Sequence, residues 1–474
     1  MSKLICISAG QLKAKKVDNA INRQHRYLNY GLLSLATVLS KFEFDPIVLH
    51  GHFDPPDVTL RIAQVLGLNN DVSPTILISL PSFYAVEWAR LFMAYTLIEH
   101  PKARFIVGGR WVVGDHPERI KALLPYANIV SAGLAEGKIV DLIRGRPPLY
   151  RPEISEQSYP GSPILDYRLL HEREKYQPSI EVSRGCGMGC SFCQERSERL
   201  QPLKAPVDVV NELQATLLQD SLVEMTPYFE ASMFVPTRGW AQSFREALDA
   251  KEFSVQWRTE GRVDNIRPEI IPELAAAGLT VLDLGLESAS PLQLQRMQKT
   301  KSPKIYLERA SRLIEACARN NVKVKVNLLL FAGETDVTID ETLCWLDARR
   351  DQFYGVSAGP VIAFGWPEEI DSYVEELKVF GASKHSSPCF GVAHLNLSHE
   401  IGHDRAQSLS RDISRRYMTA ERYYALKSFS YFSRDYLYGN FLRDVLHSPD
   451  NLTFETASLM PLSERQQPNV IETA

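Results

Sequence analysis

The sequence predicts an α/β protein with three parts: a doubly wound, Rossmann-like first domain, a partial TIM-like barrel of six strand–helix units, and a helical C-terminal region. Short apolar runs alternate with amphipathic stretches through residues 1–145 and again through 178–367. A segment rich in proline and turn residues separates the two series. Alternating strands and helices are typical of parallel sheets covered by helices.

The composition is that of a globular protein with more than one domain. The 474 residues exceed what one core usually organises, and the 45% hydrophobic and 23% charged contents are ordinary. A net charge of −4 provides no basic field for nucleic acid. No signal-peptide pattern and no long apolar run is present, so no membrane partner is expected. Seven scattered cysteines suggest no disulfide framework, which favours a reducing cytoplasm.

The first domain, residues 1–145, is expected to form a parallel sheet with helices on both faces. Helices are expected over Tyr30–Lys41 and Ala85–His100. The strand candidates are Leu4–Ser8, Pro46–His50, Thr75–Leu80, Arg104–Val107 and Asn128–Ser131. Such sheets bind ligands beyond the carboxyl ends of their strands. The candidate binding residues in those loops are Ser79, Gly108, Gly109, Gly133 and Glu136.

Residues 146–177 are predicted to form an extended connector, and the barrel is predicted over 178–367. Active-site groups of such barrels lie at the carboxyl ends of the strands. The six strand candidates are 178–183, Leu222–Phe229, Phe253–Arg258, Thr280–Leu286, Val322–Leu330 and Gly355–Ala363.

The loop after the first barrel strand carries Cys186, Cys190 and Cys193 in a C-x3-C-x2-C spacing, interleaved with three glycines. Three thiolates on one loop can hold three irons of a 4Fe-4S cluster and leave the fourth iron open to another ligand. The glycines permit positive φ angles and a close approach of the backbone. Zinc, or three unrelated core cysteines, are the alternatives.

This spacing, with Phe192 just before the last cysteine, resembles the cluster loop of the radical S-adenosylmethionine (SAM) enzymes. The resemblance implies that the three cysteines hold a 4Fe-4S cluster and that SAM chelates its open iron. An electron then cleaves SAM to a 5′-deoxyadenosyl radical. The resemblance further implies a flavodoxin- or ferredoxin-type electron donor. It also places Phe192 among the expected SAM contacts.

The same resemblance implies SAM contacts on the second and third barrel strands. Glu230 is expected after the second strand, where the family has a G-G-E motif whose carboxylate binds the SAM amino group. The glycines are missing here, and Glu224 competes for the role. On the third strand, Arg258 is favoured over Arg262 as the partner of the SAM carboxylate.

The fourth and fifth strands also resemble family segments. Residues 283–290 are similar to a G-x-E-S segment, which implies that Glu287 or Ser288 binds the ribose or amino-acid end of SAM. Residues 327–335 are similar to a strand ending in G-x-P-G-E-T, which implies that Asn327 and Phe331 lie near SAM. Glu334 and Thr335 could instead cap the helix that follows.

The first domain resembles the cobalamin-binding domain that precedes the barrel in one branch of radical SAM enzymes. The resemblance implies that Ser79, Glu136 and the strand-end glycines line a cobalamin site. The D-x-H-x-x-G motif, whose histidine coordinates cobalt in many cobalamin proteins, is absent. His50 and His52 follow the second strand, where that motif does not belong, and are interpreted as loop residues.

Residues 368–474 are predicted to be mainly helical and to cover the barrel mouth. They also contain H-E-x-x-H, the zinc-peptidase motif, at His399, Glu400 and His403. The motif lies at the start of a polar helix rather than inside an apolar one, so a polar helix start is the favoured interpretation.

The sequence as a whole predicts a cytoplasmic radical SAM enzyme that methylates an unactivated carbon or phosphorus of a small molecule or peptide with the help of cobalamin. One alternative is a radical SAM enzyme without functional cobalamin, which rearranges its substrate or transfers another part of SAM. A more distant alternative is a zinc hydrolase that uses the H-E-x-x-H residues.

Overall fold

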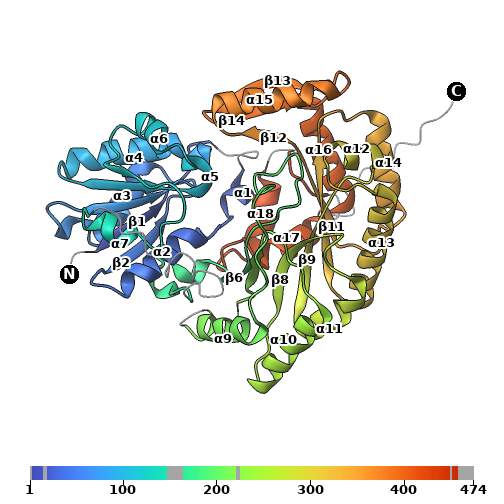
Figure 1. Ribbon diagram of the computed structural model, residues 1–474, viewed down its shortest axis with the longest axis horizontal. Helices are drawn as coiled ribbons and strands as arrows, with labels where there is room; N and C mark the ends of the chain where they lie inside the picture. The colour runs from blue at the N-terminus through green and yellow to red at the C-terminus, as the bar shows by residue number, and fades with distance from the viewer. Residues whose placement is uncertain are drawn as a thin grey trace.

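The computed structural model describes residues 3–13, 19–146, 164–219, 222, 225–448, 451–456 and 459. A five-stranded and a six-stranded parallel sheet lie side by side, and a small antiparallel sheet joins them at one end (Figure 1). Most of the expected connector, residues 147–163, and the competing candidate Glu224 lie outside the described residues. No helix in the described ranges is long and apolar enough to cross a membrane.

The first domain is the predicted doubly wound sheet, with strand order β2-β1-β3-β4-β5 and every pair parallel. The strands are β1 (Leu4–Ser8), β2 (Pro46–His50), β3 (Thr75–Ser79), β4 (Arg104–Gly108) and β5 (Ile129–Val130). Their carboxyl ends meet at one edge, which faces the barrel (Figure 1). The sequence located all five strands to within one or two residues, because buried apolar runs bounded by turn residues are a strong signal.

Helices cover both faces of this sheet. On one face α2 (Tyr30–Ser40) and α7 (Ile139–Ile143) share a core with Cys6 and Leu77. The opposite face, which includes Ile7, is covered by α3 (Pro56–Val65), α4 (Val86–Glu99) and α6 (Pro117–Leu123). The short helices are α1 (Ala20–Arg23) and α5 (Arg110–Val113).

The second sheet is an open barrel with strand order β11-β10-β9-β8-β7-β6, again all parallel. The strands are β6 (Ser179–Ser183), β7 (Tyr228–Ala231), β8 (Trp257–Arg262), β9 (Leu279–Glu287), β10 (Lys323–Leu330) and β11 (Gly355–Pro360). Strands β7 and β8 begin later than the sequence suggested. Glu230 therefore lies within β7 rather than after it, and its side chain shares the lumen face with that of Tyr228.

The helices of the barrel cover its outer face. They are α9 (Pro206–Leu217), α10 (Arg238–Ala250), α11 (Ile271–Ala276), α12 (Pro291–Arg296), α13 (Pro303–Arg319) and α14 (Asp336–Asp347). Trp257 stacks on Phe229 with ring centroids 4.3 Å apart, and Phe244 of α10 contacts both rings edge-on. Large aromatic rings thus fix β7 and β8 against the helical layer.

Most of the described C-terminal region is helical, but two of its strands join β12 (Ile362–Phe364) in a three-stranded antiparallel sheet that the sequence did not predict. The order is β12-β14-β13, with β13 (Ser383–Cys389) and β14 (Val392–Asn396). Strand β13 was missed because most of its side chains are exposed and polar, so it lacks an apolar pattern. The helices are α15 (Pro367–Leu377), α16 (His403–Tyr417), α17 (Ala420–Ser428) and α18 (Tyr438–Leu446).

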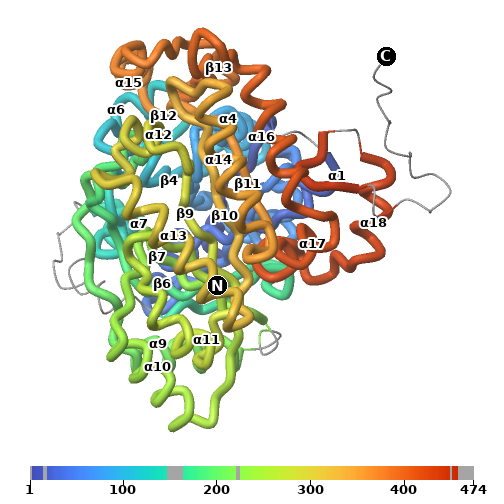
Figure 2. The backbone as a smooth tube through the Cα atoms, turned by 90° about the vertical axis from the view of Figure 1, so that its right-hand side faces the viewer, coloured from blue at the N-terminus to red at the C-terminus, as the bar shows by residue number. Residues whose placement is uncertain are grey.

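Helices α17 and α18 do not cover the barrel mouth, which corrects the prediction. The carbonyl of Leu426 accepts a hydrogen bond from Arg258, near the start of β8, and the carbonyl of Phe429 accepts one from Thr226, just before β7. These contacts lie at the amino ends of the strands, opposite the cysteine loop. The two helices pack beside the barrel together with α1 (Figure 2).

A buried ion cluster stabilises the amino-terminal half of the lumen. Arg258 forms a bidentate pair with Asp283 at 2.5 and 2.8 Å, and Lys325 lies 2.7 Å from the same carboxylate. Burial alone would raise the pKa of Asp283, but the two cations lower it well below its usual range. Since all three side chains are largely removed from water, each depends on the others for compensation.

Replacing Asp283 with alanine should leave two buried cations without a counter-ion. We expect a loss of about 3–5 kcal/mol in the free energy of unfolding, measured by urea denaturation. Asp249→Ala, which removes the exposed pair with Arg245, is the matched control and should cost less than about 1 kcal/mol. Equal losses in the two variants would contradict this account.

Candidate functional site

The cysteine loop leaves β6 at Ser183 and turns sharply at Gly185, Gly187 and Gly189, all of which have φ between 66° and 73°. A Cβ on Gly185 would collide with the Arg199 carbonyl, so only glycine fits there. The returning chain holds the loop, since the Cys186 N–H donates to the Glu198 carbonyl at 2.9 Å. The glycines predicted to permit a tight wrap do so.

The three thiols lie close together, since, besides burial, the charge of Cys190 raises the pKa of both Cys186 and Cys193. None of the three forms a disulfide. Cys190 is buried, while Cys186 and Cys193 are half-buried. Burial raises the pKa of Cys186 and of Cys193. Three thiols gathered on one loop, without other covalent partners, are a donor set that fits a 4Fe-4S cluster with one open iron.

Arg262, at the end of β8, reaches this loop. Its Nη1 lies 2.8 Å from the Cys190 Sγ, its Nη2 donates to the Lys299 carbonyl at 2.6 Å, and Asp264 holds the guanidinium from the other side. Lys299 in turn forms a 3.0 Å ion pair with Glu287, whose φ of 67° turns the end of β9. A network of charged groups therefore surrounds the thiols.

The two candidate arginines of the third strand lie in different surroundings. Arg258 is completely buried and fully engaged by Asp283 and the Leu426 carbonyl, at the opposite end of the lumen from the loop. Its side chain is therefore remote from the loop thiols. Arg262 lies on the same face of β8, four residues further along the strand, beside Cys190.

The remaining expected SAM contacts lie in three different environments. Phe192 packs edge-on against Phe331 at 6.4 Å and lies under the Lys299 ammonium, so these side chains belong to the loop environment. Asn327 is half-buried on the lumen face of β10, beside Gly285. Ser288 is buried and bonded to Thr342 at 3.2 Å, which gives it a structural role at the end of β9.

Two carboxyl groups face each other inside the lumen without a counter-ion. Glu230 of β7 accepts a 2.9 Å hydrogen bond from the Ser179 hydroxyl, and Glu260 lies next to it on β8. No ion pair to either carboxylate occurs among the described residues. Burial raises the pKa of Glu230 to about 7, and burial together with Glu230 raises the pKa of Glu260 to about 8. Glu260 is nevertheless accessible, which shows that it borders open space in the lumen.

A cavity of about 720 Å³ lies between the first domain and the barrel. It opens at the carboxyl ends of β1, β3 and β4 and reaches Glu181 and Arg184 of the barrel. All five residues predicted as ligand contacts of the first domain line it, namely Ser79, Gly108, Gly109, Gly133 and Glu136. Parallel sheets bind ligands at this edge, and the volume is typical of a cofactor pocket.

The cavity wall combines open glycines with unsatisfied polar groups. A Cβ on Gly108 would meet only the Ser131 carbonyl at 3.8 Å, and a Cβ on Gly133 would meet nothing within 4 Å. Four buried lining atoms have no hydrogen-bond partner among the described residues: Gln11 Oε1, Tyr30 Oη, His50 Nδ1 and Ser131 Oγ. A large ligand with polar substituents, such as a corrinoid, fits this wall.

His50 and His52 lie on the cavity wall and not in an ordinary loop. Their rings stack at 5.3 Å, and both pack against Tyr176. Burial lowers the pKa of His50 to about 3, so its ring is neutral. His50 Nε2 accepts a 2.9 Å hydrogen bond from the Asn29 N–H, which leaves the proton on Nδ1. In this arrangement His50 has no free lone pair for a metal.

The cavity and the thiol loop are adjacent parts of one site. Arg184 lines the cavity and forms a 2.5 Å ion pair with Glu181, and Cys186 follows two residues later. Arg110, on the opposite wall, forms an ion pair with Glu198 of the cysteine loop. A ligand in the cavity would therefore lie next to a cluster on the loop.

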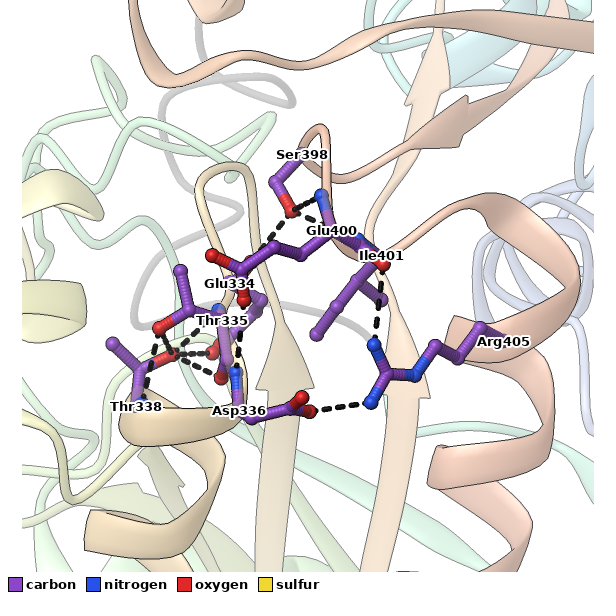
Figure 3. A network of polar contacts seen from close by, with 8 residues as sticks. All are labelled: Glu334, Thr335, Asp336, Thr338, Ser398, Glu400, Ile401 and Arg405. Carbon is purple, nitrogen blue, oxygen red and sulfur yellow. Dashed lines mark hydrogen bonds and ion pairs between the residues drawn. The ribbon is translucent and has the colours of Figure 1, made fainter.

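The H-E-x-x-H residues do not form a zinc-peptidase site. Residues 398–402 form a turn, and α16 begins only at His403, so the two histidines do not project from successive turns of one helix. Glu400 accepts a 3.4 Å hydrogen bond from the Asp336 N–H, and Arg405 bridges Glu400 and Asp336 (Figure 3). Thr335 caps α14 in the same network. The glutamate therefore has a structural role.

Comparison with known proteins agrees with the geometry of the loop and barrel. Residues 180–346, roughly a third of the chain, match the sequence profile of the Radical SAM superfamily. The ribosomal protein uS12 methylthiotransferase RimO of Xanthomonas axonopodis pv. citri is 24% identical over 306 residues, which cover 61% of this chain and 65% of that protein. RimO of Methylorubrum extorquens is 24% identical over 264 residues, 52% of this chain and 56% of that one.

Solved structures share the fold over more of the chain. The radical SAM methyltransferase TsrM from Kitasatospora setae has a TM-score of 0.58 at 16% identity, and the match covers 98% of this chain and 90% of that one. The cobalamin-dependent radical SAM enzyme OxsB has a TM-score of 0.57 at 15% identity, covering 80% and 56%. The match thus spans little more than half of OxsB and less than two thirds of the RimO proteins.

The thiol loop lies at the carboxyl end of a parallel β/α barrel, within the segment that matches the Radical SAM profile. The chain thus contains a segment similar to the Radical SAM domain, and it shares its fold with TsrM and OxsB. The domain implies a 4Fe-4S cluster and SAM as cofactors.

Several residues of the site had no clear sequence signal. Asn29 and Tyr30 line the cavity from a segment that the sequence did not connect with a ligand, and Arg184 of the cluster loop was not expected to reach the first domain. Lys299 and Arg262 come together only because β8 and β9 are neighbours. The alternation of polar residues along β8, at 258, 260 and 262, was the available hint that this strand faces a polar lumen.

The unpaired lumen carboxyls should make stability depend on pH. Since the folded pKa values of about 7 and about 8 exceed the usual value of about 4.3, stability is lost as pH rises from that value through the folded pKa values. We expect Glu230→Gln/Glu260→Gln to melt at a higher temperature than the parent at about pH 8.5, with a smaller difference at about pH 5. The exposed control Glu246→Gln should show no such pH-dependent gain.

Proposed function

We propose that this protein is a cobalamin-dependent radical SAM methyltransferase acting on an unactivated carbon or phosphorus centre of a small molecule or peptide. The observation that carries the proposal is the cavity between the two parallel sheets, whose wall includes residues just before the thiol loop. Its position allows one cofactor at the strand ends of the first domain to lie beside another on the loop. TsrM and OxsB, which share the fold, are described as a radical SAM methyltransferase and a cobalamin-dependent radical SAM enzyme.

Residues at the carboxyl end of the barrel would hold the cluster and SAM. Cys186, Cys190 and Cys193 would hold the cluster, which supplies the electron for SAM cleavage when bound. Arg262, beside Cys190, is placed to pair with the SAM carboxylate, and Lys299 keeps Glu287 oriented towards the same space. In such enzymes the protein positions the cofactors and shields their reactions from solvent.

In the first domain, Gly108 and Gly133 would leave room for the corrinoid at the strand ends, and the buried unsatisfied groups of Tyr30 and Ser131 would bond its polar substituents. Because His50 Nε2 is occupied by the Asn29 N–H, we propose that His50 does not ligate cobalt.

A corrinoid-free radical SAM reaction is the second candidate. It is favoured by the missing D-x-H-x-x-G motif and by the engaged His50. In either case we propose a flavodoxin- or ferredoxin-type electron donor and a cytoplasmic setting, in keeping with seven free cysteines.

Alanine at any one of Cys186, Cys190 or Cys193 should abolish SAM cleavage, because each thiolate holds one iron. The expected result is no 5′-deoxyadenosine or S-adenosylhomocysteine above background in an anaerobic assay with reductant. Cys344→Ala, which removes an exposed cysteine outside the site, is the control and should behave like the parent. Turnover in any loop variant would refute the role of the loop.

The two candidates differ in their metal content. Protein purified without oxygen from cells supplied with cobalamin should contain about four irons and one cobalt per chain if cobalamin is bound. Gly108→Val should keep the fold, since β-branched residues suit strands and a Cβ there meets no close contact, but it should fill the cavity and reduce cobalt at least about tenfold. Gly239→Ala on α10 is the control. Iron without cobalt in the parent would select the corrinoid-free candidate.

A further inference from the structure

Three histidines gather on the outer side of the antiparallel sheet, where the proposed function uses none of them. His385 lies on β13, His394 on the neighbouring β14, and His403 at the first position of α16. Their rings form a row: His403 stacks on His394 at 4.5 Å and 11°, and on His385 at 4.8 Å and 19°. Side chains from two strands and a helix thus meet in one cluster.

The cluster contains a complete set of ligand atoms for a metal. One donor atom each from His385, His403 and Asp404 lie within 4.8 Å of one another. Two imidazoles and one carboxylate are typical ligands of Zn²⁺ and related transition ions, whereas Mg²⁺ and Ca²⁺ prefer oxygen donors.

The orientation of His403 also matches that of a metal ligand. One ring N–H donates to the backbone carbonyl of Leu395, so in the neutral ring the other nitrogen carries the lone pair. Ligating histidines are usually oriented by such a bond from the second nitrogen. Asn396 accepts a 3.0 Å hydrogen bond from the His403 backbone N–H, which fixes the start of the helix.

We propose that His385, His403 and Asp404 bind one divalent transition-metal ion of the Zn²⁺ type, with His394 packed against the far face of His403. Donor atoms around tetrahedral Zn²⁺ lie about 3.3 Å apart, as follows from bond lengths of about 2.0–2.1 Å. Because an imidazole binds a metal in the plane of its ring, the exposed side chain of His385 would turn out of its stack on His403, and the exposed Asp404 would turn towards the same point. Three protein ligands leave the fourth position for water.

This site differs from the H-E-x-x-H motif of the sequence. It takes His403 from the motif but neither His399, which packs against Gly381, nor Glu400, which belongs to the α14 network. The bound ion would join β13 to α16. The turn of the same hairpin, at Phe390 and Gly391, packs on Phe83 of the first domain, so the ion would stiffen an element that contacts both domains.

Calorimetric titration of the full-length protein with ZnCl₂ tests the proposal. The cluster is reconstituted beforehand, so that the loop thiols are occupied, and loosely bound ions are removed with EDTA. We expect one Zn²⁺ per chain for the parent. His385→Ala and His403→Ala should each weaken binding at least about tenfold, because loss of a ligand costs no less than loss of its supporting residue. The matched control His399→Ala, four residues from His403, should bind as the parent does.

A second measurement separates metal binding from damage to the fold. Zn²⁺ should raise the melting temperature of the parent and of His399→Ala, but not that of His403→Ala. Asp404→Asn keeps both imidazoles and the helix start, and should also weaken binding. The proposal is overturned if the parent binds no Zn²⁺ once the cluster is in place, if His399→Ala loses as much affinity as His403→Ala, or if all three ligand variants retain parental affinity.

Discussion

The end of strand β6 is the point on which both halves of the site depend. Glu181 and Arg184 border the cavity of the first domain, and the first cluster thiol follows at Cys186. Because all six barrel strands are parallel, the carboxyl ends of β7 to β10 must lie at the same edge as this loop. The first domain presents its own carboxyl edge to the same region. The two carboxyl edges therefore enclose one space. The segment from Glu181 to Cys186 runs from the wall of the cavity to the first thiol of the loop.

The two ends of the barrel lumen differ in how their charged side chains are paired. At the amino-terminal end the cations Arg258 and Lys325 share the single carboxylate of Asp283, and Arg258 also holds α17 through the Leu426 carbonyl. Glu230 and Glu260, closer to the loop, have no ion-pair partner among the described residues, and Glu260 borders open space. Paired buried charges are structural, whereas a carboxyl group without an ion pair in an accessible lumen is available to a ligand. Arg258 and Arg262, four residues apart on β8, both form ion pairs, but only Arg262 lies beside a loop thiol.

The antiparallel sheet connects the first domain to the barrel. Strand β12 directly follows β11 and pairs with β14, whose hairpin turn contacts the first domain. The segment from Leu397 to Arg405 then lies at the carboxyl end of β10, where the Leu397 carbonyl accepts a hydrogen bond from the Gly333 N–H at 2.6 Å. This region therefore links both domains at the edge that carries the site, while α17 contacts the opposite end of the barrel and α18 packs beside it with α1.

The sequence by itself determined the features that depend on local pattern. The five strands of the first sheet, the spacing of the three cysteines and the glycines between them were all evident, because apolar periodicity and turn chemistry act over a few residues. Only the tertiary structure decided which arginine lies beside the loop thiols, that His50 and His52 face the cavity, and that His385, His394 and His403 form a cluster. Those outcomes depend on strand register and on which segments meet, and pairing between distant residues leaves no trace in local composition. The polar, exposed β13 and the late starts of β7 and β8 were misjudged for the same reason, since their positions are set by their neighbours in the sheets.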